Sequence, residues 1–149
     1  MASDNQPAIA RILTDKAPAP AGHYVQATVH HGVIYISGQL PVLPKGTHAP
    51  EASFDDQARQ ALANLLGVLE AAGGSADHLL KVTAYIVGIA NWPRFNAVFA
   101  EVLGDTRPAR TVVPVAELHY GYLVEIDAVA ITTPSAQGLA AERKDPGPL

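Results

Sequence analysis

Cysteine is absent from this 149-residue chain, and methionine and tryptophan occur once each. The lack of cysteine excludes disulfide bonds, thiolate nucleophiles and cysteine-based metal sites. Basic residues are also scarce, since 10 Lys and Arg face 14 Asp and Glu and give a net charge of −4. This balance offers no basic surface to phosphates, so the sequence predicts no nucleic-acid partner. Long apolar runs and a signal-peptide pattern are missing as well. We therefore expect no membrane partner and a cytoplasmic protein.

Hydrophobic residues, in contrast, make up 48% of the chain, which is enough for one well-formed core at this length. We expect residues 1–133 to form a single domain. From Pro134 onward the chain becomes polar and rich in proline, glycine and charge, a composition that cannot bury a core. Residues 134–149 are therefore predicted to be a disordered tail.

Hydrophobic periodicity predicts the element order β-β-β-α-β-α-β-β. Ser53, followed three residues later by Asp56, is predicted to cap the first helix, and Asn91 the second. The strands are expected over 9–13, 24–30, 33–37, 79–87, 110–118 and 122–132, and the helices over 53–72 and 91–104. This order indicates an α+β sandwich with two helices on one face of a mixed sheet.

The strand expected over 79–87 is largely apolar on both of its faces. Two helices can cover only one side of a sheet, so the other side needs another cover. A second copy of the chain is the simplest cover, because large exposed apolar patches are unusual in monomers. The sequence therefore predicts an oligomer.

Several short motifs occur in order along the chain and together resemble those of the RidA (YjgF-type) family of imine and enamine deaminases. The resemblance extends from Arg11 to Thr133. Its motifs are Gly22-His-Tyr-Val-Gln-Ala27, Ile36-Ser-Gly-Gln-Leu-Pro41, Gln57-Ala-Arg-Gln-Ala-Leu-Ala-Asn64, Val82-Thr-Ala-Tyr-Ile-Val87, Phe95-Asn96, Pro108-Ala-Arg-Thr111 and Leu123-Val-Glu-Ile-Asp-Ala-Val-Ala130. The resemblance implies a chorismate-mutase-like fold and a homotrimer with active sites between subunits. It also implies hydrolysis of 2-imino acids, or their enamine tautomers, to 2-keto acids and ammonia, as in a 2-iminobutanoate/2-iminopropanoate deaminase.

Two residues fit the chemistry of such a reaction. Arg110 is expected to bind the carboxylate of an imino acid, because a guanidinium makes two parallel hydrogen bonds to it. Glu125 lies in an apolar strand, where desolvation would raise its pKa and let it position water and relay protons. A protonated imine is already electrophilic, so neither a metal nor an organic cofactor is expected.

Further site residues follow from the resemblance alone. It implies that Tyr24 brings its hydroxyl near the substrate and that Ser37 and Gly38 offer backbone groups. It also implies that Asn96 and Phe99 form part of a wall of the site. Val112, two residues after the arginine, stands where a cysteine is frequent in the family's deaminases, and His23, His119 and Tyr120 also depart from the family pattern. These departures predict a substrate preference other than for the smallest, alanine-derived imino acid.

Each of these residues also has a structural interpretation. Arg110 could be a surface ion-pair residue, Glu125 could bridge to an arginine across a subunit interface, and Tyr24 could serve only in packing. His30 and His31 are adjacent and should point to opposite faces of a strand. No pair of the chain's histidines has the spacing of metal ligands, so no metal site is predicted.

Other functions remain open besides the deaminase. The chain could be a non-catalytic trimeric binder of small carboxylates or an interaction protein, because a fold and its site residues do not guarantee turnover. The ribonuclease activity that is attached to the family by name is the weakest of the alternatives, because the chain lacks a basic, aromatic-rich groove.

Overall fold

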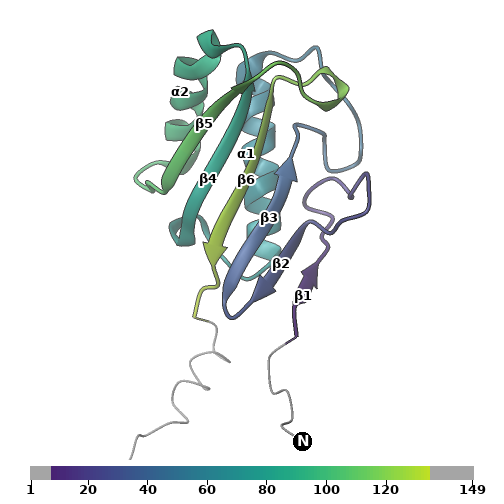
Figure 1. Cartoon of the computed structure of the whole chain (residues 1–149), viewed down its shortest axis with the longest axis vertical. Coiled ribbons are helices and arrows are strands. Elements are labelled where there is room, and N and C mark those ends of the chain that lie inside the picture. The colour runs from purple at the N-terminus through teal and green to yellow at the C-terminus, as the bar shows by residue number, and fades with distance from the viewer. Residues whose placement is uncertain (1–7, 135–149) are drawn as a thin grey trace, which may run out of the picture.

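The computed structural model describes residues 8–134. The predicted tail therefore lies, apart from Pro134, outside the described residues. Six strands form one sheet in the order β1-β2-β3-β6-β4-β5, in which only the β4–β5 pair is parallel (Figure 1). The strands are β1 (Ala10–Ile12), β2 (Ala27–His30), β3 (Val33–Gln39), β4 (Leu79–Val87), β5 (Ala109–Val115) and β6 (Val124–Ile131), and the helices are α1 (Phe54–Ala71) and α2 (Trp92–Leu103). The predicted order of eight elements and the mixed sheet are confirmed.

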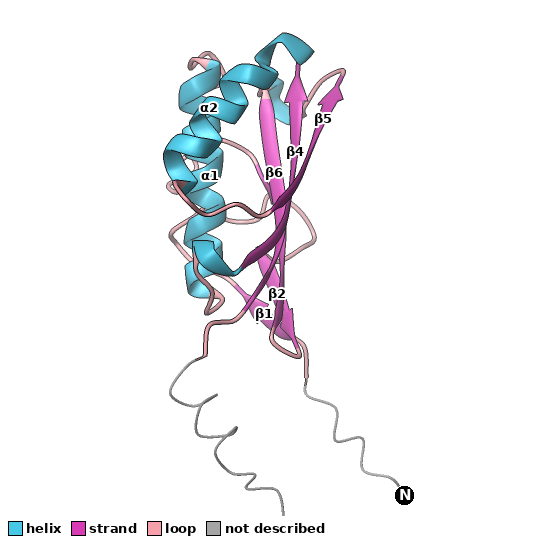
Figure 2. Cartoon of the chain, turned by 90° about the vertical axis from the view of Figure 1, so that its left-hand side faces the viewer, coloured by secondary structure: helices cyan, strands magenta, loops and turns pink. Residues whose placement is uncertain are grey.

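Both helices pack on the same face of the sheet, as Figure 2 shows with the sheet nearly edge-on. Leu62, Leu65 and Leu69 of α1 are fully buried, and they belong to one apolar cluster with Ile34 of β3 and Ile126 of β6. Burial of each such side chain contributes about 1.5–3 kcal/mol relative to exposure. The predicted α+β sandwich is thus confirmed, and its core lies between the sheet and the two helices. Within residues 8–134, no helix is both long and apolar enough to cross a bilayer.

The two predicted helix caps differ in outcome. The Ser53 hydroxyl accepts a hydrogen bond from the Asp56 N–H at 3.2 Å, as expected for the cap of α1. Asn91 precedes α2, but its side chain donates backwards to the Val87 carbonyl at 2.9 Å and caps nothing. The prediction for Asn91 was wrong because the side chain satisfies the end of β4 instead of the start of the helix.

Buried amide side chains fix the two long loops that lie beside the sheet. Gln26, 1% exposed, accepts a hydrogen bond from the Thr14 N–H and donates to the Pro18 carbonyl, so it holds the segment before β2. Asn64 of α1 donates to the Leu40 and Val42 carbonyls and holds the loop over 40–53. Gln57 donates to two further carbonyls of that loop. These loops are anchored to the core at several points, although they contain no helix or strand.

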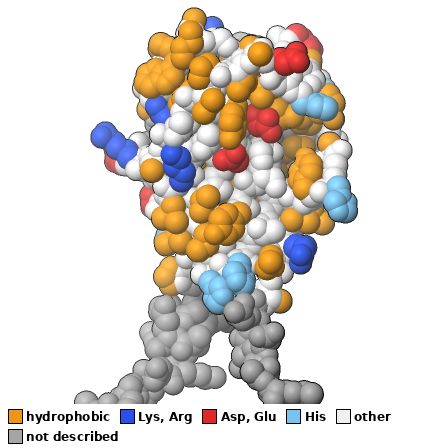
Figure 3. All heavy atoms as spheres, viewed as in Figure 1, with side chains coloured by type: hydrophobic (Ala, Val, Ile, Leu, Met, Phe, Trp, Pro, Cys, Tyr) orange, Lys and Arg blue, Asp and Glu red, His pale blue; other side chains and the backbone are white. Residues whose placement is uncertain are grey.

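The face of the sheet opposite the helices, here called the uncovered face, is mixed in character. Val82 and Ile86 of β4 point into the core, whereas Lys81, Thr83 and Tyr85 alternate with the buried positions and lie on the uncovered face. The prediction that this strand is apolar on both faces was therefore wrong. Figure 3 shows this face with acidic side chains near its centre and hydrophobic patches around them. Its exposed apolar side chains include Tyr35 of β3 and Ile131 of β6.

Candidate active site

Glu125 lies on the uncovered face, near the start of β6, an interior strand of the sheet. It pairs in register with Tyr85 and shares its face with Asp127, whose carboxylate accepts a hydrogen bond from the Tyr85 hydroxyl at 3.3 Å. Burial raises the pKa of Glu125 above its ordinary value of 4.5, and the charge of Asp127 raises it further, while His119 opposes the shift. Glu125 thus has the elevated pKa that the sequence predicted, and desolvation is the main cause.

Gly38 provides the space that the Glu125 side chain occupies. The pairing of β3 with β6 is irregular between Ile36 and Gln39, and Gly38 lies within this irregularity. A Cβ atom at position 38 would overlap Oε1 of Glu125 and would lie 3.2 Å from its Cδ and 3.5 Å from its Cγ. The close approach of this carboxylate to the backbone of β3 therefore requires glycine.

We expect Gly38→Ala to displace the Glu125 carboxylate and to lower any activity that depends on it, by roughly tenfold or more. Gly73→Ala is the matched control, because Gly73 follows α1, does not line the cavity beside Glu125, and a Cβ there would meet only Cγ2 of Thr132, at 4.0 Å. Gly73 has φ +91°, so the control carries a backbone cost that thermal melting measures separately. Equal activity of Gly38→Ala and the wild-type protein would show that the position of Glu125 is unimportant.

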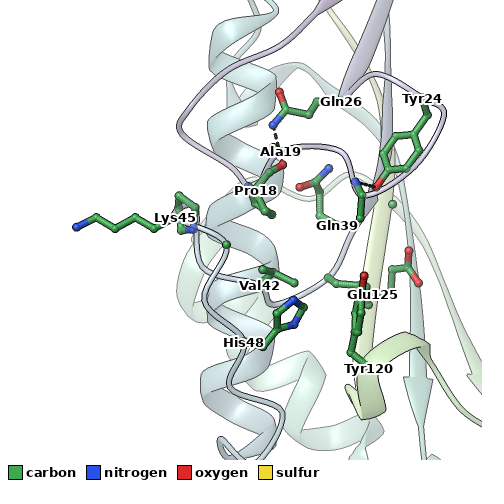
Figure 4. A pocket seen from close by; sticks show the side chains of 15 residues that line it. Pro18, Ala19, Tyr24, Gln26, Gln39, Val42, Lys45, His48, Tyr120 and Glu125 are labelled. Atoms are coloured by element: carbon green, nitrogen blue, oxygen red, sulfur yellow. Dashed lines mark hydrogen bonds between the residues drawn. The ribbon is translucent and has the colours of Figure 1, made fainter.

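A cavity of about 300 Å³, here called the Glu125 cavity, opens between the two anchored loops and β6 (Figure 4). Tyr24, Gly38 and Glu125, three of the predicted site residues, all line it. The Tyr24 hydroxyl accepts a hydrogen bond from the Ala21 N–H at 3.2 Å, so its own proton remains free for another acceptor. The other lining residues are Pro18, Ala19, Ala21, Gln26, Gln39, Leu40, Val42, Pro44, Lys45, Gly46, His48 and Tyr120.

Ser37 and Val112 are predicted site residues that do not line this cavity. The Ser37 hydroxyl donates to the Val25 carbonyl at 2.7 Å and fastens the segment before β2 to β3. Val112 pairs in register with Ala84 of β4, so it lies on the face that the helices cover and packs against the core. Ser37 and Val112 thus have structural roles in this chain. Their roles in a substrate site remain predictions.

Arg110 lies on the other side of the sheet from Glu125. It pairs in register with Val82, which points into the core, and it therefore lies on the covered face beside α2. Its guanidinium carbon is 4.8 Å from the ring centroid of Phe99, and the rings of Trp92 and Phe95 are also within cation–π range. Burial lowers the pKa of Arg110, which nevertheless remains charged at neutral pH. The aromatic residues of α2 hold this guanidinium in place.

A second cavity, of about 460 Å³, contains Arg110 together with Asn96 and Phe99, two of the predicted wall residues. None of its lining residues is acidic, and within residues 8–134 no carboxylate lies within 4.0 Å of the Arg110 guanidinium. A charged guanidinium held by aromatic rings and facing a cavity without carboxylates is a suitable site for an anion. We call it the Arg110 cavity.

Six of the eight predicted site residues thus fall into two groups on opposite faces of one subunit. Tyr24, Gly38 and Glu125 line the Glu125 cavity, and Asn96, Phe99 and Arg110 belong to the Arg110 cavity. A single chain does not bring the two groups to one substrate. The prediction that they act together, which the sequence placed between subunits, remains a prediction.

The histidines form no metal site among the described residues. The rings of His30 and His31 touch, with centroids 4.1 Å apart, because His31 lies in the β2–β3 turn with φ +50°. The prediction that they point to opposite strand faces was therefore wrong. Over residues 8–134 no group of three His, Asp or Glu side chains could hold a metal ion.

Tyr120 was predicted to alter the substrate preference, and it lines the Glu125 cavity, whereas His48 was not predicted to line the site. His119 and Tyr120 stood out in the sequence only as departures from a family pattern, and His48 comes from a loop without any periodic signal. The fold brings the loop over 40–53 next to the turn before β6, and this places the rings of His48 and Tyr120 side by side.

Comparison with known proteins identifies the group to which this fold and site belong. The model of the Endoribonuclease L-PSP family, which comprises the YjgF and RidA proteins, matches residues 14–132. The chain belongs to this family. A RutC family protein of Pyrococcus horikoshii is 40% identical over 119 residues, which cover 80% of this chain and 94% of that protein. The crystal structure of the Rid family protein YyfA of Yersinia pestis superposes with a TM-score of 0.80 at 38% identity, covering 84% of this chain and all of the other.

The name of one curated relative states a deaminase activity. The 2-iminobutanoate/2-iminopropanoate deaminase of Bos taurus is 37% identical over 123 residues, which cover 83% of this chain and 90% of that protein. Other relatives are named only as RutC family proteins. Membership of the family and the chorismate-mutase-like fold are therefore shown, and the reaction of this chain is a matter for proposal.

Proposed function

We propose that this YjgF/RidA family protein hydrolyses 2-imino acids to 2-keto acids and ammonia, at sites formed between neighbouring copies in a homotrimer. Arg110 of one copy would bind the substrate carboxylate, and Glu125 of the next copy would handle the water and the protons. The similarity to the bovine deaminase supports the reaction class.

One observation carries the proposal. Within residues 8–134, a guanidinium without a carboxylate partner lies in one cavity and a carboxylate of raised pKa lies in another, on opposite faces of the same sheet. Each cavity contains half of what imine hydrolysis needs. A symmetric assembly that sets the Arg110 cavity of one copy against the Glu125 cavity of another would complete the site.

The reaction then runs with a simple balance of atoms. Water adds to the imine carbon, and Glu125 accepts one proton from that water and passes it to the nitrogen, which gives an amino alcohol. Glu125 then takes the hydroxyl proton of this intermediate and delivers it to the nitrogen as the carbon–nitrogen bond breaks. The carbonyl forms and ammonia leaves, so that one imino acid and one water yield one keto acid and one ammonia. Glu125 ends the reaction ionised, as it began. Burial raises the pKa of Glu125 toward the working pH, and a group with such a pKa can both accept and donate a proton.

The charge distribution does not favour the ribonuclease activity that the family's name suggests. The chain has a net charge of −4, and acidic side chains lie near the centre of the uncovered face (Figure 3). A phosphate backbone would be repelled by this face. A non-catalytic binder of small carboxylates shares the Arg110 cavity with the deaminase, and only a rate measurement separates those two functions.

The test generates imino acids in place with an amino-acid oxidase, in the presence of catalase, and traps the remaining imine with semicarbazide. A deaminase lowers the amount of trapped imine and accelerates keto-acid formation in proportion to its concentration. A binder leaves both unchanged at catalytic concentrations. The mass of the protein in dilute solution, from light scattering, accompanies the assay, because a stable monomer would contradict a site between copies.

A further inference from the structure

We infer that Tyr120 and His48 form a side-chain subsite in the Glu125 cavity, and that this subsite selects 2-imino acids with flat aromatic side chains. The substrates concerned are those derived from phenylalanine, tyrosine or tryptophan. The inference rests on the proposed function for the reaction, although the binding preference can be measured separately.

Tyr120 adopts a backbone conformation that an aromatic L-residue rarely takes. It has φ +61° and ψ 12°, in the left-handed region, within the turn His119–Gly121 that precedes β6. The side chain is 47% exposed, so burial of the ring offsets little of the cost of this conformation. Strain of this kind persists where it serves a site, and here it presents an aromatic ring beside Glu125.

His48 is held firmly against that ring. The Tyr122 hydroxyl lies 3.0 Å from Nδ1 of His48 and accepts a hydrogen bond from the Ala49 N–H at 3.2 Å. Tyr122 itself is only 1% exposed, so it anchors the loop to the core. The ring centroids of His48 and Tyr120 are 4.4 Å apart and their planes are tilted by 55°. The two rings therefore form one fixed aromatic wall.

The rest of the cavity suits the same kind of ligand. Figure 4 shows His48 beside Tyr120, Glu125 on the same side, and Tyr24 at the far end of the cavity. Pro18 and Val42 add apolar surface between them. A flat ring can stack against this wall or meet it edge-on, as aromatic pairs prefer, while its imine carbon remains near Glu125. The methyl group of an alanine-derived imine would leave the wall without contact.

The experiment compares two substitutions at one position. Tyr120→Asn removes the ring and places at this φ a residue that tolerates the left-handed region, whereas Tyr120→Phe keeps the ring. Imines are generated from D-phenylalanine and D-alanine with D-amino-acid oxidase. We expect the ratio of kcat/KM for the aromatic over the small imine to fall about tenfold in Tyr120→Asn and to persist in Tyr120→Phe. Thermal melting confirms that both variants fold.

Binding of the stable keto acids phenylpyruvate and pyruvate is measured by calorimetry on the same proteins. Loss of the preference for phenylpyruvate in Tyr120→Asn supports the subsite even if no imine is hydrolysed, in which case the proposed function alone fails. A kcat/KM ratio and a binding preference that are both unchanged in Tyr120→Asn would overturn the subsite. The deaminase would stand in that case if the imines are hydrolysed.

Discussion

Glu125→Gln should lower the rate of imine hydrolysis by roughly two to four orders of magnitude, the usual contribution of a general acid–base group. Glutamine keeps the size of the side chain and much of its hydrogen bonding but cannot accept a proton from water. Binding of a 2-keto acid should change little, because in the proposed site the carboxylate of that ligand is bound by Arg110. Full activity of an intact Glu125→Gln protein would remove Glu125 from the mechanism.

Asp127→Asn is the matched control for this substitution. Asp127 lies two residues away on the same face but does not line the cavity, and its charge raises the pKa of Glu125. As a base, Glu125 is active when ionised, so kcat/KM should fall as the pH drops through its raised pKa, at a pH above 4.5. Removing the charge of Asp127 should shift this acid limb to lower pH. An acid limb that stays in place would mean that another group titrates.

Arg110→Ala should reduce kcat/KM for every 2-imino acid by on the order of a hundredfold or more, because a desolvated bidentate contact to the carboxylate is lost. Arg110→Lys should recover little, since an ammonium group cannot make the planar fork. The substitution also takes a cation from the rings of Trp92, Phe95 and Phe99, so thermal melting must show that the variant remains folded. Near-normal kcat/KM in a folded Arg110→Ala protein would mean that the carboxylate is bound elsewhere.

The sequence predicted those parts of the fold that depend on local patterns. The bounds of β4, Leu79–Val87, agree with the prediction because this run of strand-forming residues is followed directly by Gly88. α1 and its Ser53 cap agree for the same reason, since periodicity and capping are properties of neighbouring residues. Strand pairing is not local, and the order β1-β2-β3-β6-β4-β5 could not be read from the chain.

The site was harder to predict, because each side chain's direction depends on register and on loops. Alternation placed Arg110 with Val112, but only the pairing of β5 with β4 shows that both lie under α2. Gly38 was expected to offer backbone groups to the substrate. The close approach of the Glu125 carboxylate to the Gly38 backbone depends on an irregularity in the pairing of β3 with β6. His48 reaches the cavity through hydrogen bonds to Tyr122, which lies 74 residues further along the chain.

Subunit complementation tests the central claim most directly. Arg110→Ala and Glu125→Gln proteins are each assayed alone, and then after the two have been unfolded together and refolded as mixed oligomers. If every site combines Arg110 of one copy with Glu125 of the next, random mixing in a closed ring restores both groups at about a quarter of the sites. The account predicts recovery of roughly that share of the wild-type rate, and mixed oligomers no more active than the separate variants would contradict it.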